Sequence, residues 1–183
     1  MSGRCALDRR RSRPGVHGAK PKILSPYAKE LLEKQKVKLF YLLKEKQLRN
    51  LVKAVLKTKE PAPDALVRLL EQGLVNVAWL AGYVPSKTAV KQLISHGHFK
   101  VSGKRIKSAH YLVKIGDIIE IREQSKKLSL FRDLAERLQR YTAPAWLRFD
   151  SKTFKTEVVR RPELEEINLP FNLRLVIDFY SRH

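Results

Sequence analysis

The sequence predicts an α+β fold, in which a basic helical domain is joined to a module of helices packed on a small antiparallel sheet. Two observations predict this fold. Between residues 25 and 56, apolar side chains recur at helical spacing among many lysines. From residue 64 onward, short helical segments end at glycines, and segments that alternate apolar and polar side chains follow them, as strands do.

The balance of charge predicts a polyanionic partner. Of the 183 residues 43% are hydrophobic, enough for a core, and 38 Lys and Arg outnumber 18 Asp and Glu, for a net charge of +20. The longest uncharged run, 14 residues from 73 to 86, is too short to span a bilayer. The single cysteine, Cys5, excludes an internal disulfide and a multi-cysteine zinc site within this chain, and no signal peptide is evident. We therefore expect nucleic acid as the partner, no membrane, and a reducing cytosolic setting.

Residues 1–24 are predicted to form a basic arm that orders on RNA. They combine basic residues with turn formers and lack apolar periodicity, so they cannot bury enough surface to fold alone. A solvated tail is the alternative. The candidate RNA contacts in this arm are Arg9, Arg10, Arg11, Arg13 and His17, the last being a plain loop residue by default.

Residues 25–62 are predicted to form the basic helical domain. Ser25 followed by Pro26 indicates an N-cap with proline at the first helical position, and one helix, or two in series, then continues through Leu56. Pro61 and Pro63 end the pattern. The cations expected to face RNA in this domain are Lys34, Lys36, Lys38 and Arg49.

Residues 64–122 are predicted to form the module. Two short helices end at Gly73 and Gly82, and Ser86 caps a third helix. The predicted strands cover residues 99–101, 105–106, 111–113 and 118–121, with a tight turn at 102–103 between the first two.

The third helix and the hairpin after it are predicted to offer cations to double-stranded RNA. Lys87 and Lys91 are four residues apart and so share one helical face, with Gln92 and His96 beside them. Such a surface suits RNA that is recognised by its shape, through phosphates and 2′-hydroxyls. A merely solvated basic face is the alternative, and we expect Lys87 and Arg105 to be exposed. The candidate contacts on the hairpin are Lys100, Lys104, Arg105 and Lys107.

Residues 123–162 are predicted to extend the module with a helix over 128–141 and a strand pair over 146–149 and 154–159, and Lys126 and Lys127 are further RNA candidates. Residues 171–180 fit a strand and a helix equally well. We expect no catalytic residue, no cofactor and no metal. The chain has no glycine-rich phosphate loop, His96 and His98 lack neighbouring carboxylates or cysteines, and Glu163, Glu165 and Glu166 lie in a polar segment.

Residues 74–121 closely resemble the RNA-binding module named after the fourth small-subunit ribosomal protein. That module also occurs in pseudouridine synthases, in an appendage of a tyrosyl-tRNA synthetase and in a small heat-shock protein. The points of likeness are Asn76-Val77, Gly82-Tyr83, Ser86-Lys87, the run 92–96, the run 101–103 and Gly116-Asp117. Residues 14–18, 27–38, 144–147 and 176–181 resemble the bacterial-type family of ribosomal protein four itself, so the resemblance covers nearly the whole chain.

This resemblance implies a structural constituent of the small ribosomal subunit. Such a protein binds small-subunit rRNA directly at a multi-helix junction in the 5′ domain and nucleates assembly of the subunit body. It contacts neighbouring ribosomal proteins, notably the fifth, lies near the site where mRNA enters, and contributes to translational accuracy. The expected location is a cytoplasmic ribosome, with an organellar ribosome as the alternative. Residues 163–183 would return to the first helices.

The sequence also departs from the family pattern. Members usually begin some tens of residues earlier, with a segment that in many carries cysteine zinc ligands, of which only Cys5 stands near the expected place. Residues 73–75 are Gly-Leu-Val, where the family has an Arg-Leu-Asp run. We therefore expect a divergent member with a shortened N-terminus and without the zinc site.

Two other functions remain open from the sequence. An RNA-modifying enzyme of the pseudouridine synthase kind would need a catalytic domain with a nucleophilic aspartate, for which the flanks of the module leave little room. A rescue factor of the small heat-shock kind would act on free large subunits instead of residing in small ones.

Overall fold

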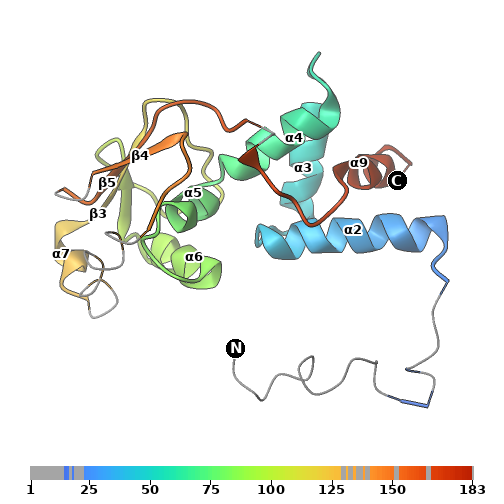
Figure 1. Ribbon diagram of the computed structural model, residues 1–183, viewed down its shortest axis with the longest axis horizontal. Helices are drawn as coiled ribbons and strands as arrows, with labels where there is room; N and C mark the ends of the chain where they lie inside the picture. The colour runs from blue at the N-terminus through green and yellow to red at the C-terminus, as the bar shows by residue number, and fades with distance from the viewer. Residues whose placement is uncertain are drawn as a thin grey trace.

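The α+β fold is confirmed by a computed structural model, which describes residues 15, 16, 18, 23–128, 131, 134, 138, 141–150, 153–163 and 166–182. These residues form seven helices and one five-stranded antiparallel sheet. Four helices gather at one end of the molecule, and the sheet with its own helices lies at the other (Figure 1). No helix among the described residues is both long enough and apolar enough to cross a membrane.

The first core is helical. It is built from α2 (Pro26–Phe40), α3 (Glu45–Val55), α4 (Ala62–Glu71) and α9 (Leu173–Arg182). Ser25 caps α2 as predicted, because its hydroxyl accepts a hydrogen bond from the Ala28 amide at 3.2 Å. The buried side chains include Val37, Leu48, Val52, Leu66, Leu70 and Val176.

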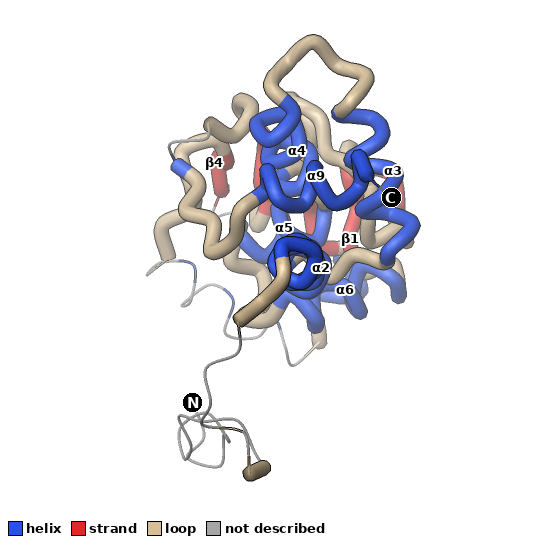
Figure 2. The backbone as a smooth tube through the Cα atoms, turned by 90° about the vertical axis from the view of Figure 1, so that its right-hand side faces the viewer, coloured by secondary structure: helices blue, strands red, loops and turns tan. Residues whose placement is uncertain are grey.

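The C-terminal segment is a helix, which resolves the ambiguity in its periodicity. Helix α9 lies along α2, and Figure 2 shows it directly above α2 when α2 is seen end-on. Leu173, Val176 and Ile177 enter the first core, so the helical spacing matches the face that α2 presents. The helical segment is two helices in series, because the chain turns at Tyr41 and Leu42, and Leu42 has a φ of 54°.

The second core lies between helices and the sheet. Helices α5 (Leu74–Leu80) and α6 (Lys87–His96) pack against it. The strands are β1 (Phe99–Val101), β2 (Lys104–Arg105), β3 (Ile118–Ile121), β4 (Leu147–Asp150) and β5 (Lys155–Val158), in the order β2-β1-β3-β5-β4. The short helix α7 (Glu123–Lys126) follows β3. Because β5 pairs with β3, the late strand pair continues the sheet of the module.

The structure corrects two strand predictions. Residues 111–113 form an isolated bridge between Leu112 and Gly73 and no strand, because their backbone groups bond to the end of α4, as in the 2.9 Å bond from the Val113 amide to the Gln72 carbonyl. Strand β2 begins one residue earlier than predicted. Residues 64–71 were predicted to belong to the module, but their buried side chains contribute to the first core. Most of the helix predicted over 128–141 lies outside the described residues.

Candidate nucleic-acid interface

The β1–β2 hairpin presents exposed cations around a tight turn. Ser102 and Gly103 both have positive φ, 47° and 78°, as in the two-residue turns whose twist matches that of the flanking strands. Lys104 and Lys107 are exposed beyond this turn and have no ion-pair partner among the described residues. The Nζ of Lys100, on β1, lies 4.0 Å from the Oε1 of Glu120 on β3. The hairpin therefore offers two free ammonium groups.

Arg105 connects the hairpin to the end of α6. It is exposed, as predicted, but its Nε donates to the Gly97 carbonyl at 3.1 Å and a terminal nitrogen donates to the His96 carbonyl at 2.8 Å. Gly97 ends α6 in the left-handed conformation, with a φ of 73°. A Cβ on Gly97 would lie 2.2 Å from the Arg105 Nε. Glycine at this position thus makes room for the arginine that caps the helix.

Two histidines stack beside this cap. The rings of His96 and His98 are 6.1 Å apart and nearly parallel, and His98 Nδ1 lies 2.9 Å from the Ser125 hydroxyl. Burial, followed by the charges of His96, Arg122 and Arg105, lowers the pKa of His98, so its ring is neutral at pH 7. Among the described residues no group of three His, Cys, Asp or Glu side chains could hold a metal.

Lys87 is not exposed, and this expectation was wrong. Its Nζ is buried without a hydrogen-bond partner among the described residues and faces the rings of Phe40 at 3.7 Å, Trp79 at 4.4 Å and Tyr41 at 5.1 Å. Desolvation lowers the pKa of Lys87 to about 8, against the opposing effect of the Glu71 carboxylate. The side chain leaves α6 towards the end of α2, so it joins the two halves of the protein.

Lys91 makes a second link between the halves. Its Nζ donates to the Leu42 carbonyl at 2.8 Å, at the turn between α2 and α3. Next to this turn, the Tyr41 hydroxyl donates to Glu71 at 2.6 Å, and the Asn76 amide donates to the same carboxylate at 2.7 Å. Gln92 and His96, on the same helix as Lys91, are exposed.

Some of the cations predicted to face RNA in the helical domain form ion pairs within the protein, and others do not. Lys34 is only 7% exposed, because it pairs with Glu45 at 3.1 Å and sits 4.4 Å from the Phe179 ring. Lys38 pairs with the same carboxylate at 3.1 Å, and Lys36 pairs with Glu33 at 2.6 Å. Arg49 is exposed and has no ion-pair partner among the described residues. Burial of Lys34 corrects the expectation that it faces RNA.

The remaining predicted RNA contacts are in α7, just after it, and in the N-terminal arm. Lys126 pairs with Glu123 at 2.6 Å within α7, and Lys127 is exposed. Arg9, Arg10, Arg11, Arg13 and His17 lie outside the described residues.

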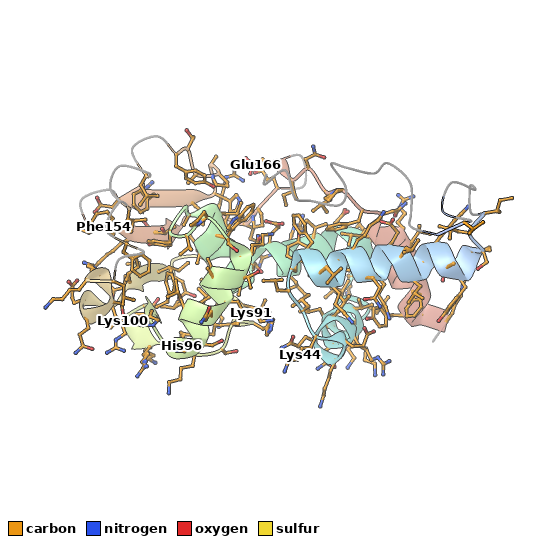
Figure 3. The ribbon with its side chains drawn as sticks, turned by 90° about the horizontal axis from the view of Figure 1, so that it is seen from below. Lys44, Lys91, His96, Lys100, Phe154 and Glu166 are labelled. Carbon is orange, nitrogen blue, oxygen red and sulfur yellow. The ribbon has the colours of Figure 1, made fainter. Side chains whose placement is uncertain are left out.

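Basic side chains of both halves share one side of the molecule. In Figure 3, Lys44, Lys91, His96 and Lys100 lie along one side, whereas Glu166 lies on the opposite side. Lys44 was missed by the sequence analysis, although its position just before α3 could have indicated an exposed cation. We use the name basic surface for these four side chains together with Arg49 on α3, Gln92 on α6, and Lys104, Arg105 and Lys107 on and after the hairpin.

Comparisons with known proteins agree with this arrangement. The S4 domain profile matches residues 72–119, and the profile of the ribosomal protein S4/S9 N-terminal domain matches residues 2–71. The boundary between the profiles coincides with the end of α4. The second core and most of the basic surface thus fall within a recognised RNA-binding domain.

Full-length relatives match as well. The small ribosomal subunit proteins uS4 of Thermodesulfovibrio yellowstonii and Caldicellulosiruptor bescii are 37% and 38% identical to this chain, each over 98% of it and 86% of the relative. That of Chlorobium phaeovibrioides is 38% identical over 96% of this chain and 87% of the relative. The family is one of structural proteins and not of enzymes, so the RNA-modifying alternative is set aside. This chain belongs to the uS4 family of small ribosomal subunit proteins.

Proposed function

We propose that the chain binds small-subunit rRNA directly through the basic surface, at a multi-helix junction of the 5′ domain. The observation that carries this proposal is the alignment of basic side chains from both halves along one side of the molecule. A surface that spans two lobes can contact more than one RNA helix at once, which a junction offers and a single duplex does not.

The contacts of Lys87 and Lys91 between the halves support the same proposal. Lys87 and Lys91 extend from α6 to the turn that ends α2, and so they hold the two lobes in one orientation before RNA is bound. A surface with a preset shape selects RNA with a matching fold and avoids the entropic cost of ordering two lobes on binding. By binding a junction with its two lobes in a fixed orientation, the protein would nucleate assembly of the subunit body.

Membership of a family of small-subunit ribosomal proteins supports a location within the ribosome. We infer contacts with neighbouring small-subunit proteins, notably the fifth, a position near the site where mRNA enters, and a contribution to translational accuracy. The ribosome concerned is cytoplasmic in this proposal. Sedimentation of tagged protein with small subunits tests the location, and its enrichment on free large subunits would favour a rescue role.

Footprinting and salt titration test direct binding. Hydroxyl radicals should reveal a protected backbone segment in small-subunit rRNA transcribed from the same genome. Removing one phosphate contact, as in Lys104→Ala or Lys107→Ala, should weaken binding and reduce the slope of log Kobs against log[salt] by about 1. Arg148→Ala is the matched control, because Arg148 is an exposed cation on β4, at the opposite edge of the sheet from β2. Equal effects of all three variants would contradict the proposed surface.

A further inference from the structure

A cavity lies where the two halves meet. Its volume is about 190 Å³, and both cores contribute to its lining. Tyr41, Leu70, Val75 and Ala109 are buried and form the floor. Ligand sites in proteins favour such boundaries and combine apolar walls with a few polar groups.

The rim of the cavity carries polar groups that are free to bind a ligand. Asn50 is exposed and His110 is half-buried, and neither side chain makes a hydrogen bond with another residue of the described chain. Burial, followed by the charges of Lys91 and Lys44, lowers the pKa of His110. The ring is therefore neutral at pH 7 and offers one donor and one acceptor, and the amide of Asn50 offers both as well.

Cations flank the same rim. The charges of Lys91 and Lys44 contribute to the lowered pKa of His110, and Figure 3 places both lysines on the side of the basic surface. Lys91 donates one of its three N–H groups to the Leu42 carbonyl, which leaves two for another acceptor. A negatively charged group beside the cavity would be stabilised at this position.

We propose that this cavity receives one unpaired nucleobase of the bound rRNA. Asn50 and His110 contact the edge of the base, and Lys44 and Lys91 hold the flanking phosphates. The inference rests on the proposed function, because it names a nucleotide-binding pocket within that interface. Proteins that recognise RNA by sequence commonly take an unstacked base into such a pocket.

The size of the cavity fits this occupant. An engineered apolar cavity of about 150 Å³ takes up benzene, so about 190 Å³ accommodates a single aromatic ring. An apolar side chain from a neighbouring ribosomal protein is the competing occupant. The flanking lysines and the unpaired polar groups on the rim favour a base, since an apolar side chain would leave all of them without partners.

Two chemical probes of the same complex separate this inference from the proposed function. Hydroxyl radicals report contacts to the RNA backbone, whereas dimethyl sulfate and carbodiimide report the access of reagent to the base edges. The wild-type chain and the Ala109→Leu variant, which fills the cavity, are each bound to small-subunit rRNA transcribed from the same genome. Ala54→Leu is the matched control, because Ala54 is on α3 and does not line this cavity.

The expected result is that one unpaired base is protected by wild type and by Ala54→Leu and becomes reactive with Ala109→Leu, while the backbone footprint persists. Affinity should fall by about tenfold, as when one stacked base is lost. If the backbone footprint persists and base reactivity is the same for all three proteins, the inference is overturned and the proposed function stands. If no backbone footprint forms with wild type, the proposed function fails first.

A second variant covers the case in which Ala109→Leu lowers the thermal midpoint. Asn50→Trp changes an exposed residue on the rim and covers the opening of the cavity without entering either core. It should expose the same base to the reagents. Continued protection of that base by Asn50→Trp would overturn the inference.

Discussion

The buried ammonium group of Lys87 makes a quantitative prediction about the pH dependence of stability. Lowering the pKa from 10.5 to about 8 corresponds to about 3 kcal/mol at about 1.4 kcal/mol per pH unit. Because the folded pKa lies below the unfolded one, the unfolded chain binds more protons between pH 8 and 10.5. The free energy of unfolding contributed by Lys87 therefore rises with pH across that window.

The aromatic rings around Lys87 reduce this cost. Three rings face the ammonium, and each such contact stabilises the charged form by about 0.5 to 2 kcal/mol. The figure of about 3 kcal/mol is therefore an upper bound. Lys87→Met removes both the cost and the ring attraction, so at pH 7 we expect its free energy of unfolding to equal that of wild type or to exceed it by up to about 3 kcal/mol.

Lys87→Glu should behave differently from Lys87→Met. A carboxylate would face the negative ring surfaces and the nearby Glu71, so we expect a loss of about 3 kcal/mol or more. Lys104→Glu is the control, because the same change of charge at an exposed site should alter stability by less than about 0.5 kcal/mol.

Urea unfolding of the free protein, followed by circular dichroism from pH 7 to 10.5, measures these differences. Subtracting the Lys87→Met curve from the wild-type curve removes the titration of the tyrosines and other lysines, which both proteins share. Wild type should gain up to about 3 kcal/mol relative to Lys87→Met between pH 8 and 10.5. A difference that does not vary with pH, together with a stable Lys87→Glu, would show that the ammonium is solvated and would refute the reasoning.

Three other changes test separate parts of the structure. Gly97→Ala places a Cβ against the Arg105 guanidinium at a left-handed position, so urea unfolding should show a loss of about 2 kcal/mol, and a negligible loss would mean that α6 ends differently. Tyr83→Phe removes a buried hydroxyl that bonds to Thr156 and to backbone carbonyls, and it should cost about 1 to 3 kcal/mol; unchanged stability would argue against that network. Desolvation raises the pKa of Glu45, but hydrogen bonds from Tyr180, Lys34 and Lys38 outweigh it and hold the pKa at about 2. The free energy of unfolding of wild type at pH 7 should therefore exceed that of Glu45→Gln by about 1 kcal/mol, after allowance for solvent screening. That excess is present above pH 4.5 and should disappear as the pH falls towards 2, and an excess that persists at pH 2 would contradict the assignment.

The local features of this fold can be predicted from the sequence because they depend on residues that are neighbours in the chain. The cap at Ser25, the glycine that ends α6 and the turn at Gly103 all follow from the conformations that these residue types favour. The C-terminal helix could not be assigned in this way, since its apolar residues fit both periods. Its conformation depends on the apolar face of α2, which lies far away in the sequence.

The expectation of exposure was wrong at Lys34 and Lys87 because it relied on residue type instead of position. Lys87 stands three and seven residues before the buried Val90 and Ile94, and Lys34 stands three residues before the buried Val37. Both lysines therefore lie on the inward faces of their helices. Long side chains allow such positions when another element offers rings or carboxylates, and only the tertiary arrangement shows that it does.

This distinction changes what the net charge of +20 implies for binding. Only cations that are free to meet a phosphate release counterions, so the salt dependence counts unpaired groups and not the total charge. Lys34, Lys38 and Lys87 are engaged within the protein, whereas Lys104 and Lys107 are exposed without ion-pair partners among the described residues. Lysines that look alike in the sequence therefore have two different roles. Lys87, on the inward face of α6, contacts the end of α2 and so links the two halves, whereas Lys34 pairs within the helical half. The hairpin lysines are the ones that we propose to bind RNA.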